Sequence, residues 1–310
     1  MARYTEHVDS IATGAKRAIA FGGGGEWFLA WMLGYATGLA QEGVDLAQAD
    51  VTLGTSAGSI VGAAIKGGKL IEVSETLRKL GADPDQANKL LSISVGAQSQ
   101  VRAQSVMGAT TEITKDSLNQ IGRAAMAAHN SPVDKYILSL NAILGLDSWP
   151  IGHHTTATDC YTGQSLIVSE ANGIPISVAA AASSSLPGVN GPTWLGDQFC
   201  MDGGVSDSST HGLALTGAKF VLIIGMFDFE AHPPEHVNPA FGIAERIAPG
   251  TAQREARELR AQGSTVHVTI AGPDPSTNFM DPATIIPAIT LGISAGKTDA
   301  AVLGPLWNAE

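Results

Sequence analysis

Short apolar runs alternate with longer amphipathic stretches in the N-terminal part of the chain. Residues 18–21 and 51–53 predict buried strands, because each run is short and apolar and is followed by a glycine-rich turn. The pattern over 26–41 predicts a helix, and a second helix follows the next turn and ends at the glycine pair 67–68. Two successive strand–turn–helix units indicate a parallel α/β sheet with its chemistry at the carboxyl ends of the strands.

The middle of the chain has a different pattern. Residues 69–150 are more polar and have helical periodicity, so we expect an inserted helical region that covers a site. Strand patterns return in "HHTTATDCYTGQSLIVSE", and the small-residue stretch "ISVAAAASSS" predicts a helix. The apolar run 220–227 predicts a central buried strand, "STVHVTIAGP" predicts the last strand, and residues 282–302 predict a helix.

Composition favours one globular domain over residues 1–310. Apolar residues make up 44% of the chain and charged residues 15%, which excludes disorder for most of it. We find no internal repeat and no linker. The simplest organisation is a core over about 17–225, with the helical insertion inside it and a C-terminal extension over about 226–310.

The net charge of −11 argues against nucleic-acid binding, which depends on Lys and Arg. It also gives no attraction to an anionic membrane, so any membrane contact is expected to be peripheral. The polar start "MARYTEHVDS" has no secretory apolar run, and the apolar stretch 28–40 is broken by glycines, which predicts no transmembrane segment and a cytoplasmic protein. Cys160 and Cys200 lack metal-ligand spacing and are expected to be reduced thiols.

The turn after the second predicted strand reads "GTSAG", residues 54–58. Gly-x-Ser-x-Gly between a strand and a helix is typical of a nucleophile elbow, in which a strained turn exposes the serine hydroxyl. The following helix adds N–H groups and a partial positive charge that favour an alkoxide. A chance match is the alternative in a chain rich in Ala and Gly, but the flanking strand and helix patterns favour Ser56 as a nucleophile.

The glycine run 22–25 exposes backbone N–H groups to a negative charge, either a bound phosphate or a transient oxyanion. A P-loop needs Gly-Lys-Ser/Thr after its glycines, and here "EWF" follows. A dinucleotide-binding fingerprint needs a small residue where Trp27 stands. The oxyanion is therefore the favoured interpretation.

Asp202, in "FCMDGGVSD", is the candidate base for Ser56. It follows a predicted strand, and the two glycines after it let the chain turn sharply and leave the carboxylate free to face a partner. A plain Asp-Gly turn is the structural alternative.

Together these motifs resemble the patatin-like phospholipase family. Four blocks stand in the family's order, namely the glycine run, "GTSAG", "AAASSSLPGV" at 180–189 and "DGG" at 202–204. The stretch "ATDCYTGQ" is similar to the family's Thr-Asp-x-x-Thr-Gly turn. The resemblance covers about residues 17–225.

The resemblance implies a three-layer α/β sandwich with a mainly parallel central sheet flanked by helices. It implies a serine hydrolase that cleaves lipid acyl esters and needs no metal or other cofactor. Ser56 would attack the ester carbonyl and Asp202 would take its proton directly, without a histidine. Backbone donors would hold the oxyanion. The donors implied for this oxyanion hole are Gly22, Gly23, Gly24, Gly25 and Ala57.

The chain departs from the family after the glycine run, where the family has a basic residue and a glycine. Glu26 and Trp27 stand there instead. A carboxylate at roughly 7 Å from an oxyanion would repel it by about 2 kcal/mol at an effective dielectric of about 20. Either Glu26 points away and stabilises the first turn of its helix, which we favour, or the activity is weak or altered.

Glu26, Trp27 and Phe28 are also candidate substrate-binding residues, because they follow the glycine run directly. For the two aromatic residues, packing in the core of an amphipathic helix is favoured over an acyl-chain wall.

Three other functions stay open. One is an acyltransferase that uses the same dyad, and a second is a catalytically silent family member that binds a lipid or a partner. The third is a Ser-His-Asp hydrolase, although none of its possible bases has a recognisable catalytic context. Those histidines are His211, His232, His236 and His267. The sequence leaves the oligomeric state open.

Overall fold

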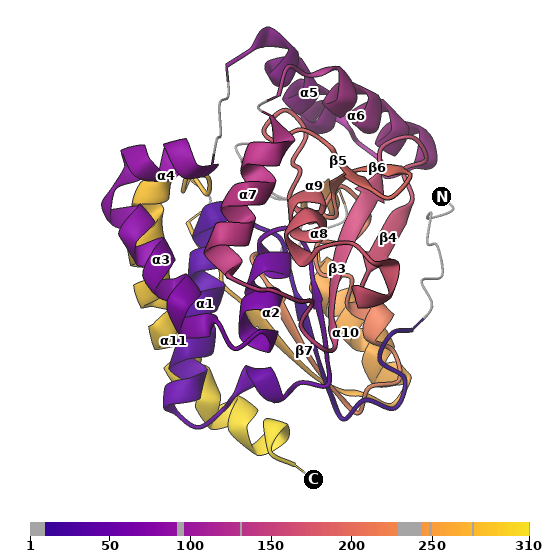
Figure 1. Ribbon diagram of the computed structural model, residues 1–310. Helices are drawn as coiled ribbons and strands as arrows, with labels where there is room; N and C mark the ends of the chain where they lie inside the picture. The colour runs from indigo at the N-terminus through magenta and orange to yellow at the C-terminus, as the bar shows by residue number, and fades with distance from the viewer. Residues whose placement is uncertain are drawn as a thin grey trace.

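The computed structural model describes most of the chain, namely residues 10–91, 96–130, 132–228, 243–247, 250–274 and 276–309. Eight strands form a single sheet in the described residues (Figure 1). The strands are β1 (Arg17–Phe21), β2 (Val51–Gly54), β3 (His153–Asp159), β4 (Ser165–Val168), β5 (Thr193–Leu195), β6 (Gln198–Asp202), β7 (Phe220–Gly225) and β8 (Thr265–Ile270). The helices are α1 (Gly25–Gln41), α2 (Ala57–Lys66), α3 (Leu70–Ala82), α4 (Pro84–Leu91), α5 (Gln98–Ala109), α6 (Lys115–Ala127), α7 (Val133–Leu144), α8 (Ile176–Ser183), α9 (Ile243–Ile247), α10 (Thr251–Ala261) and α11 (Ile285–Trp307).

The sheet is mainly parallel. Its strand order is β5-β6-β3-β2-β1-β7-β8, with β4 paired to β3 outside this path. The strands from β3 to β8 along this order run parallel, whereas β4 and β6 pair antiparallel with β3, and β5 pairs antiparallel with β6. The run 220–227 forms β7, which is fully buried but lies next to the edge strand β8 rather than at the centre of the sheet.

Alternate side chains of the central strands face two different cores. Ile19 and Phe21 of β1 pack into a large core with α1, α2 and α11. Ala18 and Ala20 face the other side, where they pack in a cluster with residues of α10. Helices therefore cover both faces of the sheet, and the predicted three-layer α/β sandwich is confirmed.

Glycines let α1 and α11 pack backbone to backbone (Figure 1). A Cβ atom on Gly34 would lie 2.3 Å from the carbonyl oxygen of Ile289, and one on Gly292 would lie 2.1 Å from the carbonyl oxygen of Trp31. Gly38 and Gly296 repeat the arrangement one turn further on. The two helices thus approach each other at a distance that leaves no room for side chains between them.

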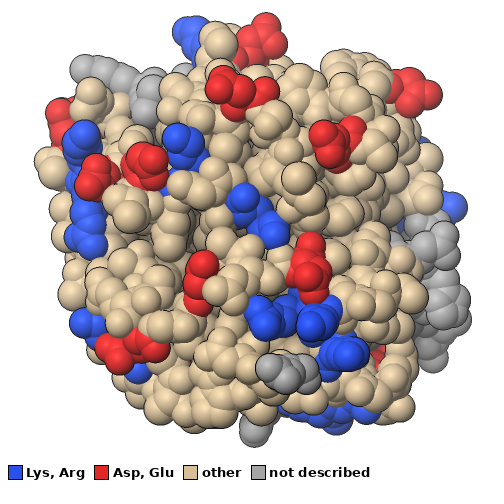
Figure 2. All heavy atoms as spheres, turned by 60° about the horizontal axis from the view of Figure 1, so that its bottom comes forward, with Lys and Arg blue, Asp and Glu red and all other residues tan. Residues whose placement is uncertain are grey.

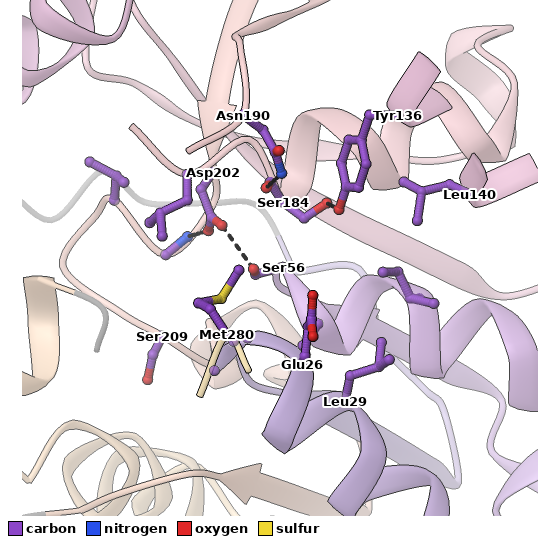
Figure 3. Close-up of a pocket in the computed structure, with 18 of the residues that line it drawn as sticks. Glu26, Leu29, Ser56, Tyr136, Leu140, Ser184, Asn190, Asp202, Ser209 and Met280 are labelled. Carbon is purple, nitrogen blue, oxygen red and sulfur yellow. Dashed lines mark hydrogen bonds between the residues drawn. The ribbon is translucent and has the colours of Figure 1, made fainter. Parts of the chain in front are cut away.

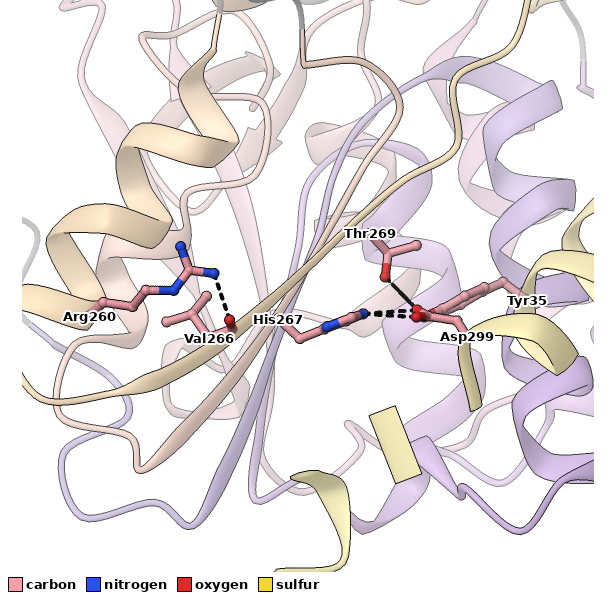
Figure 4. Close-up of polar contacts among 6 residues, drawn as sticks. All are labelled: Tyr35, Arg260, Val266, His267, Thr269 and Asp299. Carbon is pink, nitrogen blue, oxygen red and sulfur yellow. Dashed lines mark hydrogen bonds and ion pairs between the residues drawn. The ribbon is translucent and has the colours of Figure 1, made fainter. Parts of the chain in front are cut away.

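A polar cluster ties the same two helices to β8 (Figure 4). Asp299 on α11 lies 3.0 Å from Nε2 of His267 and accepts hydrogen bonds from Thr269 over 2.8 Å and from the hydroxyl of Tyr35 on α1. These hydrogen bonds lower the pKa of the Asp299 carboxyl against the opposing effect of burial. On the opposite side of β8, Arg260 donates to the backbone carbonyl of Val266 over 2.7 Å.

Most predicted elements form, with bounds that differ by a few residues. The C-terminal helix begins at Ile285 and continues to Trp307, beyond the expected end at residue 302. Gly304 and Pro305 weaken the helix signal there, but Leu303 and Trp307 are fully buried, and their packing extends the helix.

Charge is dispersed on the face of the molecule that Figure 2 shows. Acidic and basic side chains lie beside one another on a largely uncharged surface, so the net charge of −11 is not gathered on this face. No helix in the described part of the chain is both long and apolar enough to cross a membrane.

The contact between α1 and α11 predicts the effect of adding a methyl group. We expect Gly292→Ala to lower the free energy of unfolding by about 1–3 kcal/mol, because the new Cβ forces the two backbones apart. Gly304→Ala in the same helix is the matched control, since its Cβ would meet only a side-chain carbon of Val44, at 3.5 Å. Urea unfolding followed by circular dichroism measures both variants. Equal stability of the two variants would contradict the proposed close contact.

Candidate active site

Ser56 occupies the turn between β2 and α2. Its backbone has φ 52° and ψ −119°, a conformation that residues other than glycine rarely adopt. Such strain persists only where the surrounding contacts impose it. Here a Cβ on Gly58 would lie 2.2 Å from the carbonyl oxygen of Phe21, so α2 touches the end of β1 directly. This contact explains the second glycine of "GTSAG" and fixes the elbow.

Asp202 lies within hydrogen-bonding distance of Ser56 (Figure 3). The Ser56 hydroxyl donates to Oδ2 of Asp202 over 2.8 Å, and the Gly204 N–H donates to Oδ1 over 2.7 Å. The sheet register explains the approach, because Thr155 of β3 pairs with β2, and Ala157, two residues further on, pairs with Asp202 of β6. The structure therefore brings together the two residues that the motifs single out.

Burial raises the pKa of the Asp202 carboxyl to about 6, while the hydrogen bonds from Gly204 and Ser56 oppose this rise. The residue is only 4% exposed. A carboxylate with a raised pKa binds a proton more tightly than an exposed one and is still ionised at neutral pH. These are the properties that a general base requires.

Ser183, at the C-terminal end of α8, accepts hydrogen bonds from the backbone at Ser56 and from the residue after Asp202. The Ser56 N–H donates to Oγ of Ser183 over 2.9 Å, and the Gly203 N–H donates to the Ser183 carbonyl oxygen over 3.1 Å. The hydroxyl of the next residue, Ser184, lies 2.9 Å from the hydroxyl of Tyr136. Sequence reasoning assigns no role to Tyr136, because it lies in a helix without a motif.

Two of the predicted oxyanion donors are already engaged. The Gly22 N–H donates to the carbonyl oxygen of Ile224 over 2.9 Å, and the Gly23 N–H donates to that of Ser209 over 3.2 Å. Contrary to the prediction, these two N–H groups are not available to an oxyanion, because Gly22 continues the pairing of β1 with β7 and Gly23 binds the segment that follows Asp202.

The remaining predicted donors stay available. In the stretches that the structure describes, the backbone N–H groups of Gly24, Gly25 and Ala57 have no hydrogen-bond partner. All three residues line the same pocket as Ser56. They are the candidate oxyanion donors that the geometry leaves.

The pocket beside Ser56 is partly open to solvent. Its charged side chains are Glu26 and Asp202, and no Lys, Arg or His lines it among the described residues. Most of the wall is apolar. Part of that wall comes from the helices of region 69–150, namely Leu77 of α3, Met107 of α5, and Tyr136, Leu140 and Ile143 of α7.

Glu26 lines this pocket, so the expectation that it points away is wrong (Figure 3). Its two carboxyl oxygens are buried and have no hydrogen-bond partner among the described residues. Burial, with a smaller effect from the charge of Asp281, raises the pKa of Glu26 to about 8. The Glu26 side chain extends from the first turn of α1 into the pocket.

Trp27 and Phe28 lie in the core and are not among the residues that line the pocket. Trp27 contacts Phe279 edge-on, with ring centroids 6.1 Å apart, and Phe28 stacks on Trp31 at 5.9 Å. Their candidacy as substrate-binding residues is therefore not supported, and core packing is their role.

The histidines do not complete a triad in the described residues. Nε2 of His211 lies 3.0 Å from the carbonyl oxygen of Gly203, and His267 pairs with Asp299. Neither histidine lines the pocket. His232 and His236 lie outside the described residues.

A buried carboxylate anchors the segment that follows Asp202. Glu255 of α10 accepts hydrogen bonds from the Ser208 hydroxyl at 2.6 Å, the Thr210 hydroxyl at 2.5 Å and the Gly212 N–H at 2.9 Å. Ser209, within this segment, accepts the hydrogen bond from the glycine run. Glu255 thus holds the segment whose backbone binds the glycine run at Gly23. No motif signals it, because it lies on an amphipathic helix with other charged residues.

The fold and the elbow define an α/β protein with a serine at the carboxyl edge of a mainly parallel sheet. The model of the patatin-like phospholipase family matches residues 19–215, more than half of the chain, and the protein belongs to that family. No curated protein matches the sequence.

Two solved structures are similar to this chain at low identity. VipD from Legionella pneumophila is 14% identical, with a TM-score of 0.41, over 97% of this chain and 72% of VipD. The type III effector protein ExoU is 14% identical, with a TM-score of 0.33, over 91% of this chain and 53% of ExoU.

The Glu255 contacts predict a large effect on stability. We expect Glu255→Ala to lower the free energy of unfolding by about 3 kcal/mol or more, because three buried donors lose their acceptor. Glu258→Ala, at an exposed position of the same helix, should change it by less than about 0.5 kcal/mol. Urea unfolding of both variants measures the difference, and a similar small effect for both would show that Glu255 anchors nothing.

Proposed function

We propose that the protein is a serine hydrolase that cleaves lipid acyl esters, with Ser56 as nucleophile and Asp202 as general base. The observation that carries this proposal is the 2.8 Å hydrogen bond from the Ser56 hydroxyl to Asp202. Family membership supports a lipid acyl hydrolase activity. The reaction is that of a carboxylic ester hydrolase.

The reaction needs two proton transfers through one carboxylate. Asp202 takes the hydroxyl proton as Oγ of Ser56 attacks the ester carbonyl carbon, and then gives this proton to the departing alcohol. Water next attacks the acyl-enzyme, Asp202 accepts a proton from it, and the ester bond to Ser56 breaks. The proton returns to Oγ, and the free carboxylic acid leaves.

The charge that develops on the carbonyl oxygen requires donors close to Ser56. The backbone N–H groups of Gly24, Gly25 and Ala57 are the candidates, since all three lack a partner within the described residues. Ala57 also begins α2, whose N-terminal end carries a partial positive charge. Backbone donors that are fixed before the reaction stabilise an oxyanion without reorganisation.

The apolar wall of the pocket fits an acyl chain. Leu29, Leu77, Leu140 and Ile143 all line it. Each methylene group that leaves water contributes about 0.8 kcal/mol, so a pocket of this composition favours esters of longer acids up to the length it can enclose.

Loss of the nucleophile should abolish covalent labelling. We expect a fluorophosphonate probe to label the wild-type protein and not Ser56→Ala, because the probe reacts with an activated serine hydroxyl. Ser105→Ala is the matched control, since Ser105 is exposed and its hydroxyl donates to the carbonyl of Val101. Labelling is measured by in-gel fluorescence. Equal labelling of Ser56→Ala and the wild type would exclude Ser56 as the nucleophile.

Asp202 as base predicts both a mutational and a pH effect. Asp202→Asn should reduce kcat on a short-chain nitrophenyl ester by about 10²–10⁴-fold, because no group is left to take the proton. In the wild type, kcat/KM should rise with pH with a midpoint of about 6, since Asp202 must be ionised and burial raises its pKa to that value. Full activity of Asp202→Asn, or a midpoint near the ordinary aspartate pKa of about 4, would contradict this role.

A further inference from the structure

A buried carboxyl group without a partner faces the same pocket as the nucleophile. Glu26 follows Gly25 directly and lines the pocket together with Ser56 and Ala57 (Figure 3). Neither of its carboxyl oxygens has a hydrogen-bond partner among the described residues, and each exposes almost no surface to solvent. A buried polar group without a hydrogen-bond partner is costly, so a partner supplied by a bound substrate would relieve the cost.

The surroundings of Glu26 favour its protonated form. The titratable groups that face it are Asp202 at the end of β6, Tyr136 on α7 and Asp281 just before α11. None of these carries a positive charge, and no Lys, Arg or His lines the pocket in the described residues. Burial is the main cause of the raised pKa of Glu26, about 8, and the charge of Asp281 raises it further. The N-terminal end of α1 favours the ionised form, but burial outweighs it.

We propose that Glu26 is a further catalytic residue, whose protonated carboxyl group donates a hydrogen bond to the carbonyl oxygen of the bound ester. This inference rests on the proposed function of Ser56 and Asp202. The proton stays on Glu26 throughout, and the hydrogen bond strengthens as the carbonyl oxygen becomes an oxyanion.

The two carboxyl groups of the pocket then have opposite tasks. Asp202 is ionised and accepts a proton, whereas Glu26 is neutral and donates a hydrogen bond. Ionised Glu26 would instead repel the oxyanion and leave it with backbone donors only. The substrate class that fits is an acyl ester without a negative charge close to the scissile bond, because no Lys, Arg or His among the described lining residues could pair with such a charge.

The pH dependence of hydrolysis tests the role of Glu26. With an uncharged short-chain nitrophenyl ester, we expect kcat/KM of the wild type to fall with a midpoint of about 8, as Glu26 loses its proton. Glu26→Gln keeps an N–H donor but cannot ionise, so its activity at pH 7 should stay within a few-fold of wild type and should not fall at this midpoint. Glu26→Ala removes the donor and should lose about 100-fold or more.

Two further variants separate this role from a structural one. Glu42→Gln makes the same substitution at the exposed C-terminal end of α1, and its profile should match wild type. Asp281→Asn removes the charge that raises the pKa of Glu26, so the alkaline fall should move to lower pH. Wild-type activity in Glu26→Ala, or an unchanged alkaline fall in Glu26→Gln, would overturn the donor role.

Infrared difference spectroscopy measures the proton on Glu26 without turnover. The spectrum of wild type minus Glu26→Gln should contain a protonated carboxyl band at pH 7 that disappears with a midpoint of about 8. Absence of this band at pH 7 would overturn the inference, whether or not the protein hydrolyses esters. A wild-type protein that neither hydrolyses esters nor reacts with the fluorophosphonate would overturn the proposed function, and the carboxyl band would still decide the protonation of Glu26.

Discussion

The contact between Gly58 and the carbonyl oxygen of Phe21 is the constraint on which the site depends. It lets α2 begin directly against the end of β1, where a single methyl group would separate them. Because of it, the elbow at Ser56 and the glycine run after β1 meet at one edge of the sheet. The N–H groups of Gly24, Gly25 and Ala57, which have no partner among the described residues, then lie on the same pocket. Backbone packing thus creates a concentration of donors that side chains could not supply in so small a space.

Burial raises the pKa of both carboxyl groups in the pocket, but the two pKa values end up different. Both lose solvation, and the pKa of each rises, but Asp202 also accepts hydrogen bonds from Ser56 and Gly204, which keep its pKa lower than that of Glu26. Between pH 6 and pH 8 one carboxyl is ionised while the other is protonated. The hydrogen bonds to Asp202 and the charge of Asp281 near Glu26 both contribute to this difference.

The sequence predicts the elements and the Ser56–Asp202 pair well, because short local patterns carry both. Gly-x-Ser-x-Gly and Asp-Gly-Gly each require glycine for steric reasons that are visible within five residues. The features that escaped prediction depend on distant segments. The N–H groups of Gly22 and Gly23 donate hydrogen bonds to residues far along the chain. The carboxyl oxygens of Glu26 are buried in a pocket whose wall comes from distant segments of the folded protein. Glu255 is likewise defined by its partners and not by its neighbours in sequence.

The glycine faces of α1 and α11 have a consequence for how the protein is made. Helix α1, which begins at the glycine run, lies near the start of the described chain, and its closest partner, α11, begins more than 240 residues later. During synthesis, α1 therefore emerges long before α11, and its glycine face cannot pack on α11 until then. Contacts this distant in sequence close slowly. The pocket can take its final shape only after α11 has emerged from the ribosome, so we expect the active conformation to form after that point.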